Sequence, residues 1–246
     1  MPPVRTGPSI GLIAQVILLV GLAGTVGLGT AGWLVGLGYG LVTWGALTRG
    51  LVRSGAVRLG PADRVTLARA TLVGAVAALA ATAFTRPVPV PVLVSVAAVA
   101  LALDAVDGRV ARRTGTVSAL GARFDMEVDA FLLLVLSGYV VHVVGPAAGW
   151  VLAIGGMRYA YAAAGWVLPW LRGGLPPRYW RKVVAAAQGV VLVVAAAGVL
   201  PRPVLLTVLA GALALLVESF GRDVRWLWRH TAVPGHRVGW QEKPGM

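Results

Sequence analysis

The chain has 246 residues, of which 58% are hydrophobic, and its mean hydropathy is +0.81. A soluble core of this length cannot hide so much apolar surface, so the composition predicts a multi-pass membrane protein. The absence of cysteine excludes disulfides, thiolate metal sites and cysteine nucleophiles. The net charge of +13 would suit a nucleic-acid partner, so the distribution of that charge has to be examined first.

Eight apolar runs follow one another along the chain, each close to the ~20 residues that a membrane-spanning helix requires. They cover residues 10–29, 31–47, 67–84, 91–107, 124–144, 147–168, 183–200 and 203–220. The sequence therefore predicts an all-α polytopic membrane bundle.

The first two runs are Gly-rich and are separated by a very short break at residues 30–32. This pattern predicts a closely packed hairpin, and only six helices span the membrane if the hairpin merely dips into it. A cleaved signal peptide is the competing interpretation of the first run. Its leader carries only Arg5, and the apolar stretch exceeds the usual length of about 7–15 residues.

Lysine and arginine gather in alternate breaks between the runs. The groups are Arg49, Arg53, Arg58, Arg64 and Arg69; Arg109, Arg112, Arg113 and Arg123; Arg172, Arg178, Arg181 and Lys182; and Arg222, Arg225, Arg229, Arg237 and Lys243. The other breaks hold only Arg86 and Arg202. This alternation is the positive-inside pattern, so we expect both termini in the cytoplasm and no nucleic-acid partner. Trp226 and Trp228 predict an interfacial helix after the last span.

One short segment, residues 104–129, concentrates the acidic side chains. It holds five of the nine acids, namely Asp104, Asp107, Asp125, Glu127 and Asp129. Spacings of three and four residues place Asp104 and Asp107 on one face of a helix, and Asp125 and Asp129 on one face of the next. The basic connection "RRTGTVSAL" makes these helices antiparallel neighbours. The two acidic faces are therefore expected to converge near the cytoplasmic boundary of the membrane.

Carboxylates at that depth need a compensating cation. One candidate is the nearby arginines, which are Arg109, Arg112, Arg113 and Arg123. The regular one-face spacing favours a chelate instead, and aspartate oxygens without His or Cys suit Mg²⁺ or Mn²⁺. Such a metal keeps positions open for substrate phosphates, which suggests a diphosphate substrate. His142, His230 and His236 have no partners at ligand spacing and are assigned to packing or to the surface.

The segment also matches a known motif. Eight positions reproduce the pattern D-x2-D-G-x2-A-R-x8-G-x3-D-x3-D, and they are Asp104, Asp107, Gly108, Ala111, Arg112, Gly121, Asp125 and Asp129. On these residues the chain resembles the CDP-alcohol phosphotransferase family. "ADRVTLARATL" is similar to the segment that opens the family core, although typical members have Asn where this chain has Ala62 and Asp63. The resemblance extends from Asp63 to about Phe220 and implies a six-helix core, which we place at residues 49–221. The N-terminal transmembrane hairpin expected at 1–48 lies outside it, and residues 222–246 are expected to form a cytoplasmic tail.

The resemblance also implies a reaction. An alcohol attacks the phosphorus of a CDP-linked lipid, usually CDP-diacylglycerol, and CMP leaves. By similarity, the metal ligands are Asp104, Asp107, Asp125 and Asp129. Asp129 is also the general base, and the nucleotide and diphosphate site is lined by Gly108, Ala111, Arg112 and Gly121. The side chain of Glu127 lies off this shared face and is expected to be solvated or ion-paired. Relatives are commonly homodimers.

Two other functions are consistent with an acidic cluster in a membrane bundle. Membrane prenyltransferases carry Asp-rich magnesium diphosphate motifs, but they have a second such motif, which the remaining acids do not form here. A cation transporter would place carboxylates near mid-membrane on several helices, whereas these lie beside a basic loop. Both alternatives are therefore less consistent with the sequence than phosphatidyl transfer.

The alcohol acceptor is predicted from basic residues. Two arginines lie inside apolar runs, and Arg69 is expected to snorkel from a helix start to the membrane surface. Arg158 is the other. A charged side chain inside a membrane span is costly, so Arg158 is expected either to have a function or to pair with the aspartates. Arg178, Arg181 and Lys182 begin the next helix in "PPRYWRKVVAAAQG" and resemble the acceptor-phosphate segment of relatives. These cations predict a phosphorylated polyol, such as glycerol 3-phosphate or inositol phosphate.

Overall fold

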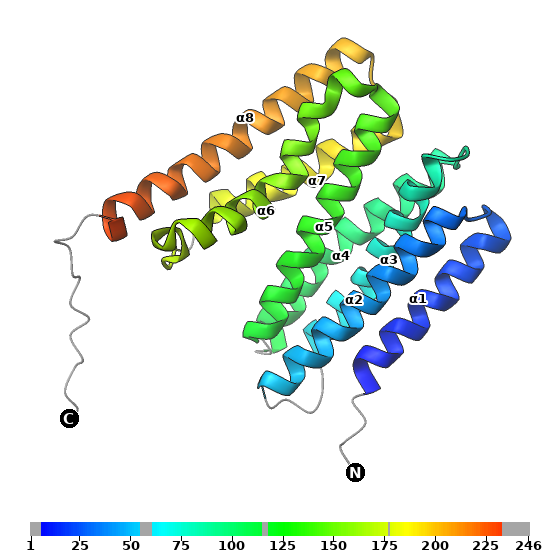
Figure 1. Cartoon of the computed structure of the whole chain (residues 1–246), viewed down its shortest axis with the longest axis horizontal. Helices are drawn as coiled ribbons and strands as arrows, with labels where there is room; N and C mark the ends of the chain where they lie inside the picture. The colour runs from blue at the N-terminus through cyan, green and yellow to red at the C-terminus, as the bar shows by residue number, and fades with distance from the viewer. Residues whose placement is uncertain (1–5, 55–60, 115–117, 177, 233–246) are drawn as a thin grey trace.

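The structure, a computed structural model, describes residues 6–54, 61–114, 118–176 and 178–232 (Figure 1). Within these ranges the chain forms helices and no strand. The α-helices are α1 (Thr6–Thr25), α2 (Thr30–Ser54), α3 (Pro61–Ala83), α4 (Val90–Thr114), α5 (Ala119–Val144), α6 (Leu152–Val167), α7 (Tyr179–Ala197) and α8 (Arg202–Leu227). Short 3₁₀ segments cover Pro146–Val151 and Pro169–Arg172, and a π-helical turn covers Trp228–Ala232.

The predicted all-α bundle is confirmed, because each apolar run overlaps one α-helix of the part of the chain that the structure describes. Three boundaries differ from expectation. The break in the hairpin lies at residues 26–29, where Gly27 adopts a positive φ of 78° that suits glycine. The run at 147–168 is not one α-helix, since a 3₁₀ segment follows Gly145 at φ 109° before α6 begins. The interfacial helix expected after the last span is a continuation of α8 through the π-helical turn.

Five of the described helices are long and apolar enough to cross a membrane. These segments are Gly7–Thr25, Asp63–Ala83, Leu120–Val144, Tyr179–Ala197 and Arg202–His230, and Val90–Asp104 forms a shorter apolar helix. Large apolar side chains cover the outside of the bundle, with Ile17 of α1 and Val167 of α6 exposed by 66% and 79%. An outer surface of this kind requires lipid rather than water as its solvent.

Helix α3 lies at the centre of one half of the bundle, in contact with α1, α2, α4 and α5. It is the most buried of the long apolar helices, and its segment "GAVAALAA" supplies small residues that let neighbouring backbones approach closely. A Cβ atom at Gly32 of α2 would lie 2.7 Å from the carbonyl oxygen of Ala78. This close packing fixes the position of α3, which carries part of the site.

The N-terminal hairpin shares the core of the bundle. Leu19 and Leu22 of α1 belong to the same buried apolar cluster as Val73 and Val76 of α3. The boundary expected at residue 48 lies inside α2, and the boundary expected at residue 221 lies inside α8. The hairpin therefore packs directly against the helices that follow it.

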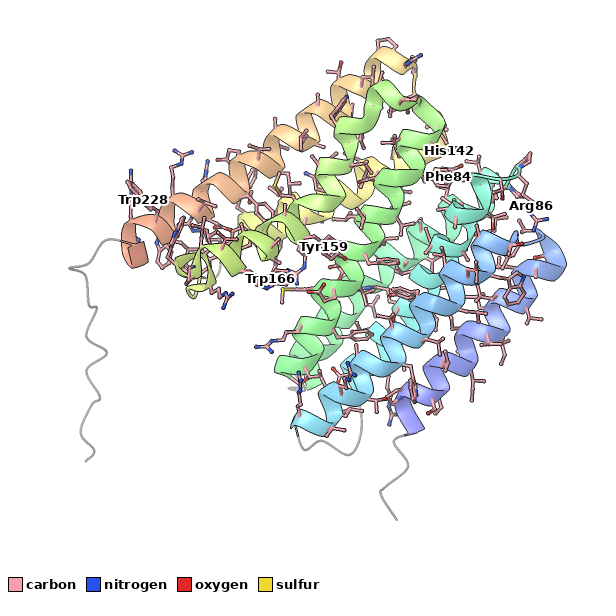
Figure 2. The ribbon with its side chains drawn as sticks, viewed as in Figure 1. Phe84, Arg86, His142, Tyr159, Trp166 and Trp228 are labelled. Carbon is pink, nitrogen blue, oxygen red and sulfur yellow. The ribbon has the colours of Figure 1, made fainter. Side chains whose placement is uncertain are left out.

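The other half of the bundle contains α6, α7 and α8. Helix α7 packs against α4, α5 and α8, and α6 packs against α5. A Cβ atom at Gly155 of α6 would lie 2.6 Å from the backbone nitrogen of Leu134, so glycine allows α6 to cross α5 closely. Figure 2 shows Phe84 and His142 side by side at one end of the bundle, where their ring centroids are 4.5 Å apart. From this end α6 and α8 diverge from α1 to α5 (Figure 1).

Candidate active site

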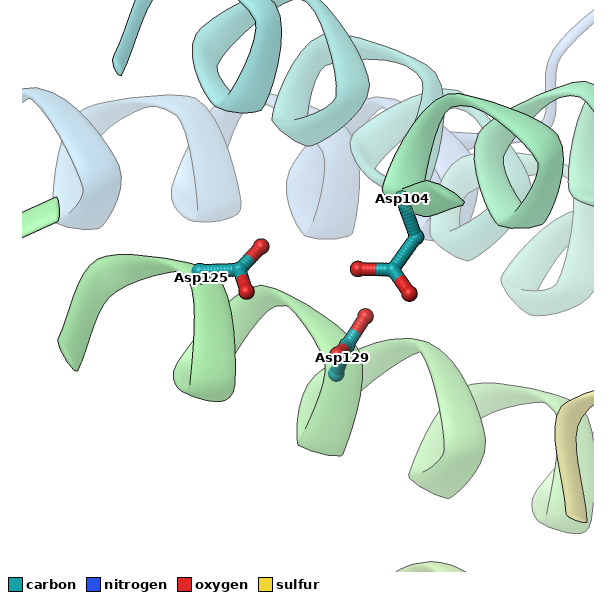
Figure 3. A group of neighbouring side chains, drawn as sticks. All are labelled: Asp104, Asp125 and Asp129. Carbon is teal, nitrogen blue, oxygen red and sulfur yellow. The ribbon is translucent and has the colours of Figure 1, made fainter. Parts of the chain in front are cut away.

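Three aspartates from two helices form the candidate site. Asp104 lies on α4, while Asp125 and Asp129 lie one turn apart on α5 (Figure 3). One carboxylate oxygen from each lies within 4.8 Å of the others. The side chains of Asp104, Asp125 and Asp129 are exposed by 41%, 33% and 39%, so the cluster is open to a ligand. The predicted convergence of the two acidic faces is therefore present in the structure.

A buried arginine lies among these carboxylates. Arg69 of α3 is fully buried, and its Nη1 lies 2.5 Å from Oδ1 of Asp104 and 2.7 Å from Oδ1 of Asp125. Its Nη2 lies 2.8 Å from Oδ1 of Asp129 and donates to the backbone carbonyl of Asp125 at 3.2 Å. A buried guanidinium without anions would cost several kcal/mol, and the carboxylates compensate for this cost.

The sequence-based expectation for Arg69 was wrong. We expected this side chain to snorkel toward the membrane surface, whereas its guanidinium points into the site and contacts the three carboxylates. The rule that intramembrane charge indicates function would have identified it, because Arg69 lies inside an apolar run just as Arg158 does.

The first turn of α5 is fixed by a cap and by a close approach from α3. Ser118 Oγ accepts a hydrogen bond from the backbone nitrogen of Gly121 at 2.8 Å, which satisfies one of the free N–H groups at the helix start. A Cβ atom at Gly121 would overlap the carboxylate of Asp63, a residue of α3 that is 9% exposed. In the structure, Gly121 therefore makes room for Asp63. Its predicted contact with a nucleotide stays a prediction.

The remaining motif residues occupy the last turns of α4. This helix runs to Thr114, so Asp107, Gly108, Ala111 and Arg112 belong to it. Their side chains lie outside the described residues, and so do those of Arg109 and Arg113. The roles expected for these residues from the motif stay predictions.

Glu127 lies between the two site aspartates of α5 and has a separate partner. Its carboxylate pairs with the guanidinium of Arg158 on α6, and the side chains of Glu127 and Arg158 are exposed by 56% and 38%. The expected ion pairing of Glu127 is thus present. The described partner of Arg158 is Glu127 rather than an aspartate of the cluster, so the pair holds a partly exposed cation of α6 against α5.

The basic segment at the start of α7 contacts α8 and the preceding loop. Arg181 Nη1 lies 3.5 Å from Oδ2 of Asp223, and Arg181 also donates to the carbonyl oxygen of Pro176. The indole of Trp180 donates to Glu218 at 3.4 Å. Arg178 is the N-cap residue of α7, and Lys182 lies in its first turn. The described partner of Arg158 is therefore on α5, whereas that of Arg181 is on α8.

The donor set of the site fits a hard divalent cation. Its described donors are carboxylate oxygens within 4.8 Å of one another, and the guanidinium that the structure describes among them is that of Arg69. A carboxylate can accept from a guanidinium with one oxygen and bind a cation with the other. The three described carboxylates carry more negative charge than one arginine compensates. Described histidines make other contacts: His142 packs on Phe84, and His230 stacks on Trp226 with ring centroids 4.3 Å apart.

Comparison with known proteins identifies a family for most of the chain. Neither a search of curated proteins nor a search of solved structures found a match. The profile of one family, CDP-alcohol phosphatidyltransferase, matches residues 60–219. That range includes Arg69 and all three clustered aspartates and covers well over half of the chain, and it leaves α1 and α2 outside. The chain that brings these carboxylates together therefore belongs to the CDP-alcohol phosphatidyltransferase family.

Proposed function

We propose that the protein transfers a phosphatidyl group from a CDP-linked lipid, such as CDP-diacylglycerol, to a phosphorylated polyol and releases CMP. The observation that carries this proposal is the convergence of three accessible carboxylates from α4 and α5 on one point. Membership of the family supports phosphatidyl transfer over the prenyltransferase and cation-transporter alternatives. The cytoplasmic location of the site is also a proposal, and it rests on the alternation of basic loops.

In this proposal, Asp104, Asp107, Asp125 and Asp129 hold Mg²⁺ or Mn²⁺. When bound, the cation neutralises diphosphate charge and polarises the phosphorus that is attacked. Arg69 holds the carboxylates of the two helices in a fixed arrangement. Gly108, Ala111, Arg112 and Gly121 line the nucleotide and diphosphate site.

The proposed chemistry is a single displacement at phosphorus. The acceptor hydroxyl oxygen forms a bond to the phosphorus that carries the lipid, and the bond from this phosphorus to the CMP oxygen breaks. Asp129 takes the hydroxyl proton as general base. The partial exposure of its side chain supports this role, because a base must lie within hydrogen-bond reach of the hydroxyl.

A phosphorylated acceptor is supported by the cation that α6 holds against α5 and by the basic segment at the start of α7. Arg158 lies beside α5 through its pair with Glu127, and an exposed ion pair of this kind is weak enough to exchange partners. Guanidinium groups bind phosphate oxygens bidentately and offset the repulsion between two anionic substrates. We assign Arg158, Arg178, Arg181 and Lys182 to the acceptor phosphate.

The experiment that tests the proposal measures CMP release by the purified protein with CDP-diacylglycerol and a panel of alcohols. We expect release with glycerol 3-phosphate or inositol phosphate and little with serine, choline or free inositol. CMP release with an uncharged alcohol and none with any phosphorylated alcohol would contradict the assignment of a phosphorylated acceptor. No CMP release with any alcohol and any CDP-linked lipid would contradict the proposed reaction.

A further inference from the structure

An apolar groove runs beside the site along a wall that the family match does not include. Its volume is about 550 Å³, and it lies between α2 and α5, with Tyr159 of α6 on its border. Val35, Tyr39 and Val42 line it from α2, which precedes the matched residues 60–219. The ring of Tyr39 stacks on Phe131 of α5 with centroids 4.6 Å apart, which holds the two walls together.

The groove and the site are built on the same turns of α5. Phe124, Glu127 and Val128 line the groove, while Asp125 and Asp129 hold the carboxylate cluster. Groove and site therefore lie at the same level of the bundle. The seven helical rises between Val35 and Val42 on the groove wall of α2 amount to a length of about 10 Å.

The border of the groove is charged only near the site. Arg123 and Glu127 lie on it, and Glu127 pairs with Arg158. The remaining lining is mostly apolar, and Val42 is 70% exposed, so the groove opens sideways to the lipid that surrounds the bundle. Arg123 on this border and Arg158 next to it supply guanidinium groups beside an apolar groove, an arrangement complementary to a phospholipid, whose phosphate is anionic and whose chains are apolar.

We propose that this groove holds one acyl chain of the phosphatidyl group while its phosphorus lies at the aspartate cluster. The inference rests on the proposed phosphatidyl transfer and adds a function for α2, the second helix of the N-terminal hairpin. The chain enters from the membrane past Val42 and lies along Tyr39 and Val35. Contact with apolar side chains on α2 and α5 then makes the affinity for the donor depend on acyl length.

The test compares groove-filling variants with controls at neighbouring positions. Val42→Trp and Val35→Trp fill the groove, whereas Leu41→Trp and Leu34→Trp add the same side chain to exposed positions outside it. CMP release is measured with dioleoyl and dibutyryl CDP-diacylglycerol. We expect the groove variants to lose about tenfold in kcat/KM for the dioleoyl donor, because each displaced methylene removes severalfold in affinity, and to change little for the dibutyryl donor. The control variants should leave kcat/KM unchanged for both donors.

Two outcomes would contradict the proposal that the groove holds an acyl chain. Equal losses for both donors, or no loss for either, would overturn the proposal. A groove variant that changes the oligomeric state in detergent without discriminating between donors would identify the groove as an interface between two copies instead. Because a Trp variant can misfold, thermal unfolding is measured for all four, and Ala46→Leu provides a smaller filling substitution in the same groove.

A second measurement separates this inference from the proposed function. A phosphatidyl lipid with a diazirine near the end of one acyl chain is photolysed with the wild-type protein, and the labelled peptides are identified by mass spectrometry. Labels concentrated on the groove residues of α2 and α5 would support the groove even if the protein released no CMP. Labels spread equally over the exposed face that carries Leu34 and Leu41 would overturn it even in an active enzyme.

Discussion

Arg69 on α3 donates to Asp129 on α5 across 2.8 Å, and the same guanidinium lies 2.5 Å from Asp104 on α4. A single buried cation thus joins the three helices that build the site. This relationship explains how carboxylates can gather before any metal binds. It also gives the arginine two separable effects, one on the stability of the bundle and one on the arrangement of the metal ligands.

Replacing Arg69 by Gln should destabilise the protein. Removing one partner from a buried ion pair costs about 3–5 kcal/mol, and the partial exposure of the three aspartates reduces this to roughly 2–3 kcal/mol. Thermal unfolding in detergent measures the effect. Arg123→Gln, which changes an exposed arginine on α5, serves as the control and should change the Tm little. An unchanged Tm in Arg69→Gln would show that the guanidinium does not hold the helices together.

Addition of Mg²⁺ or Mn²⁺ should stabilise the protein, and its removal by a chelator should abolish CMP release. A ligand that binds only the folded state raises the free energy of unfolding with the logarithm of its concentration above the Kd, and the Tm rises with it. We expect the increase in the wild type to be lost in Asp104→Asn and Asp125→Asn, since each variant removes a charged ligand. An equal increase in Asp104→Asn and the wild type would place the cation elsewhere.

Asp129→Asn should separate chemistry from donor binding. The amide cannot take the hydroxyl proton, so we expect CMP release to fall by about 10²–10⁴-fold, the usual contribution of general-base catalysis. Binding of a CDP-linked lipid should remain substantial, because Asp104 and Asp125 are unchanged, whereas Asp104→Asn should lose both properties. Glu218→Gln, which changes a half-buried acid on α8 that pairs with Arg222, is the control. Near-normal CMP release by Asp129→Asn would show that another group is the base.

The helices and the acidic face could be predicted because they depend on local spacing. Apolar runs of sufficient length form helices in lipid whatever they pack against, and residues three and four apart share a face in any α-helix. The short connection between α4 and α5 then forces their acidic faces together. These features need no knowledge of the packing between distant segments.

The rest of the site depends on packing between helices that are distant in sequence. The role of Arg69 is set by the rotation of α3 against α4 and α5, and the approach of Asp63 to Gly121 is set by the same contact. The groove depends on α2 lying beside α5, which spacing along the chain does not specify. Hydrophobic periodicity identifies a buried face but not its neighbour, so these three features required the structure.

The orientation of the bundle can be tested with single cysteines, because the chain contains no native cysteine. Cysteines at Ser54, Ser118 or Gly173 should be shielded from an impermeant thiol reagent in intact cells, since they lie beside basic loops that the positive-inside rule retains in the cytoplasm. Cysteines at Val88 or Ala147 should be labelled, and permeabilised cells provide the control for reactivity. The reverse labelling pattern would place the site on the outer face.

Arg158→Gln should weaken binding of the acceptor far more than binding of the CDP-linked donor. A hydrogen bond to a charged group contributes about 1.5–3 kcal/mol, so loss of the guanidinium should raise the acceptor KM by roughly tenfold to a hundredfold for glycerol 3-phosphate or inositol phosphate. The KM for the CDP-linked lipid should change little, since the aspartates and Arg69 are untouched.

Glu127→Gln is the matched variant, because it removes the described partner of Arg158 and keeps the cation. It should leave the acceptor KM unchanged or lower it, because the guanidinium is then free to bind phosphate. If both substitutions raised the acceptor KM equally, the ion pair would be needed for structure, and Arg158 would not be a ligand of the acceptor phosphate.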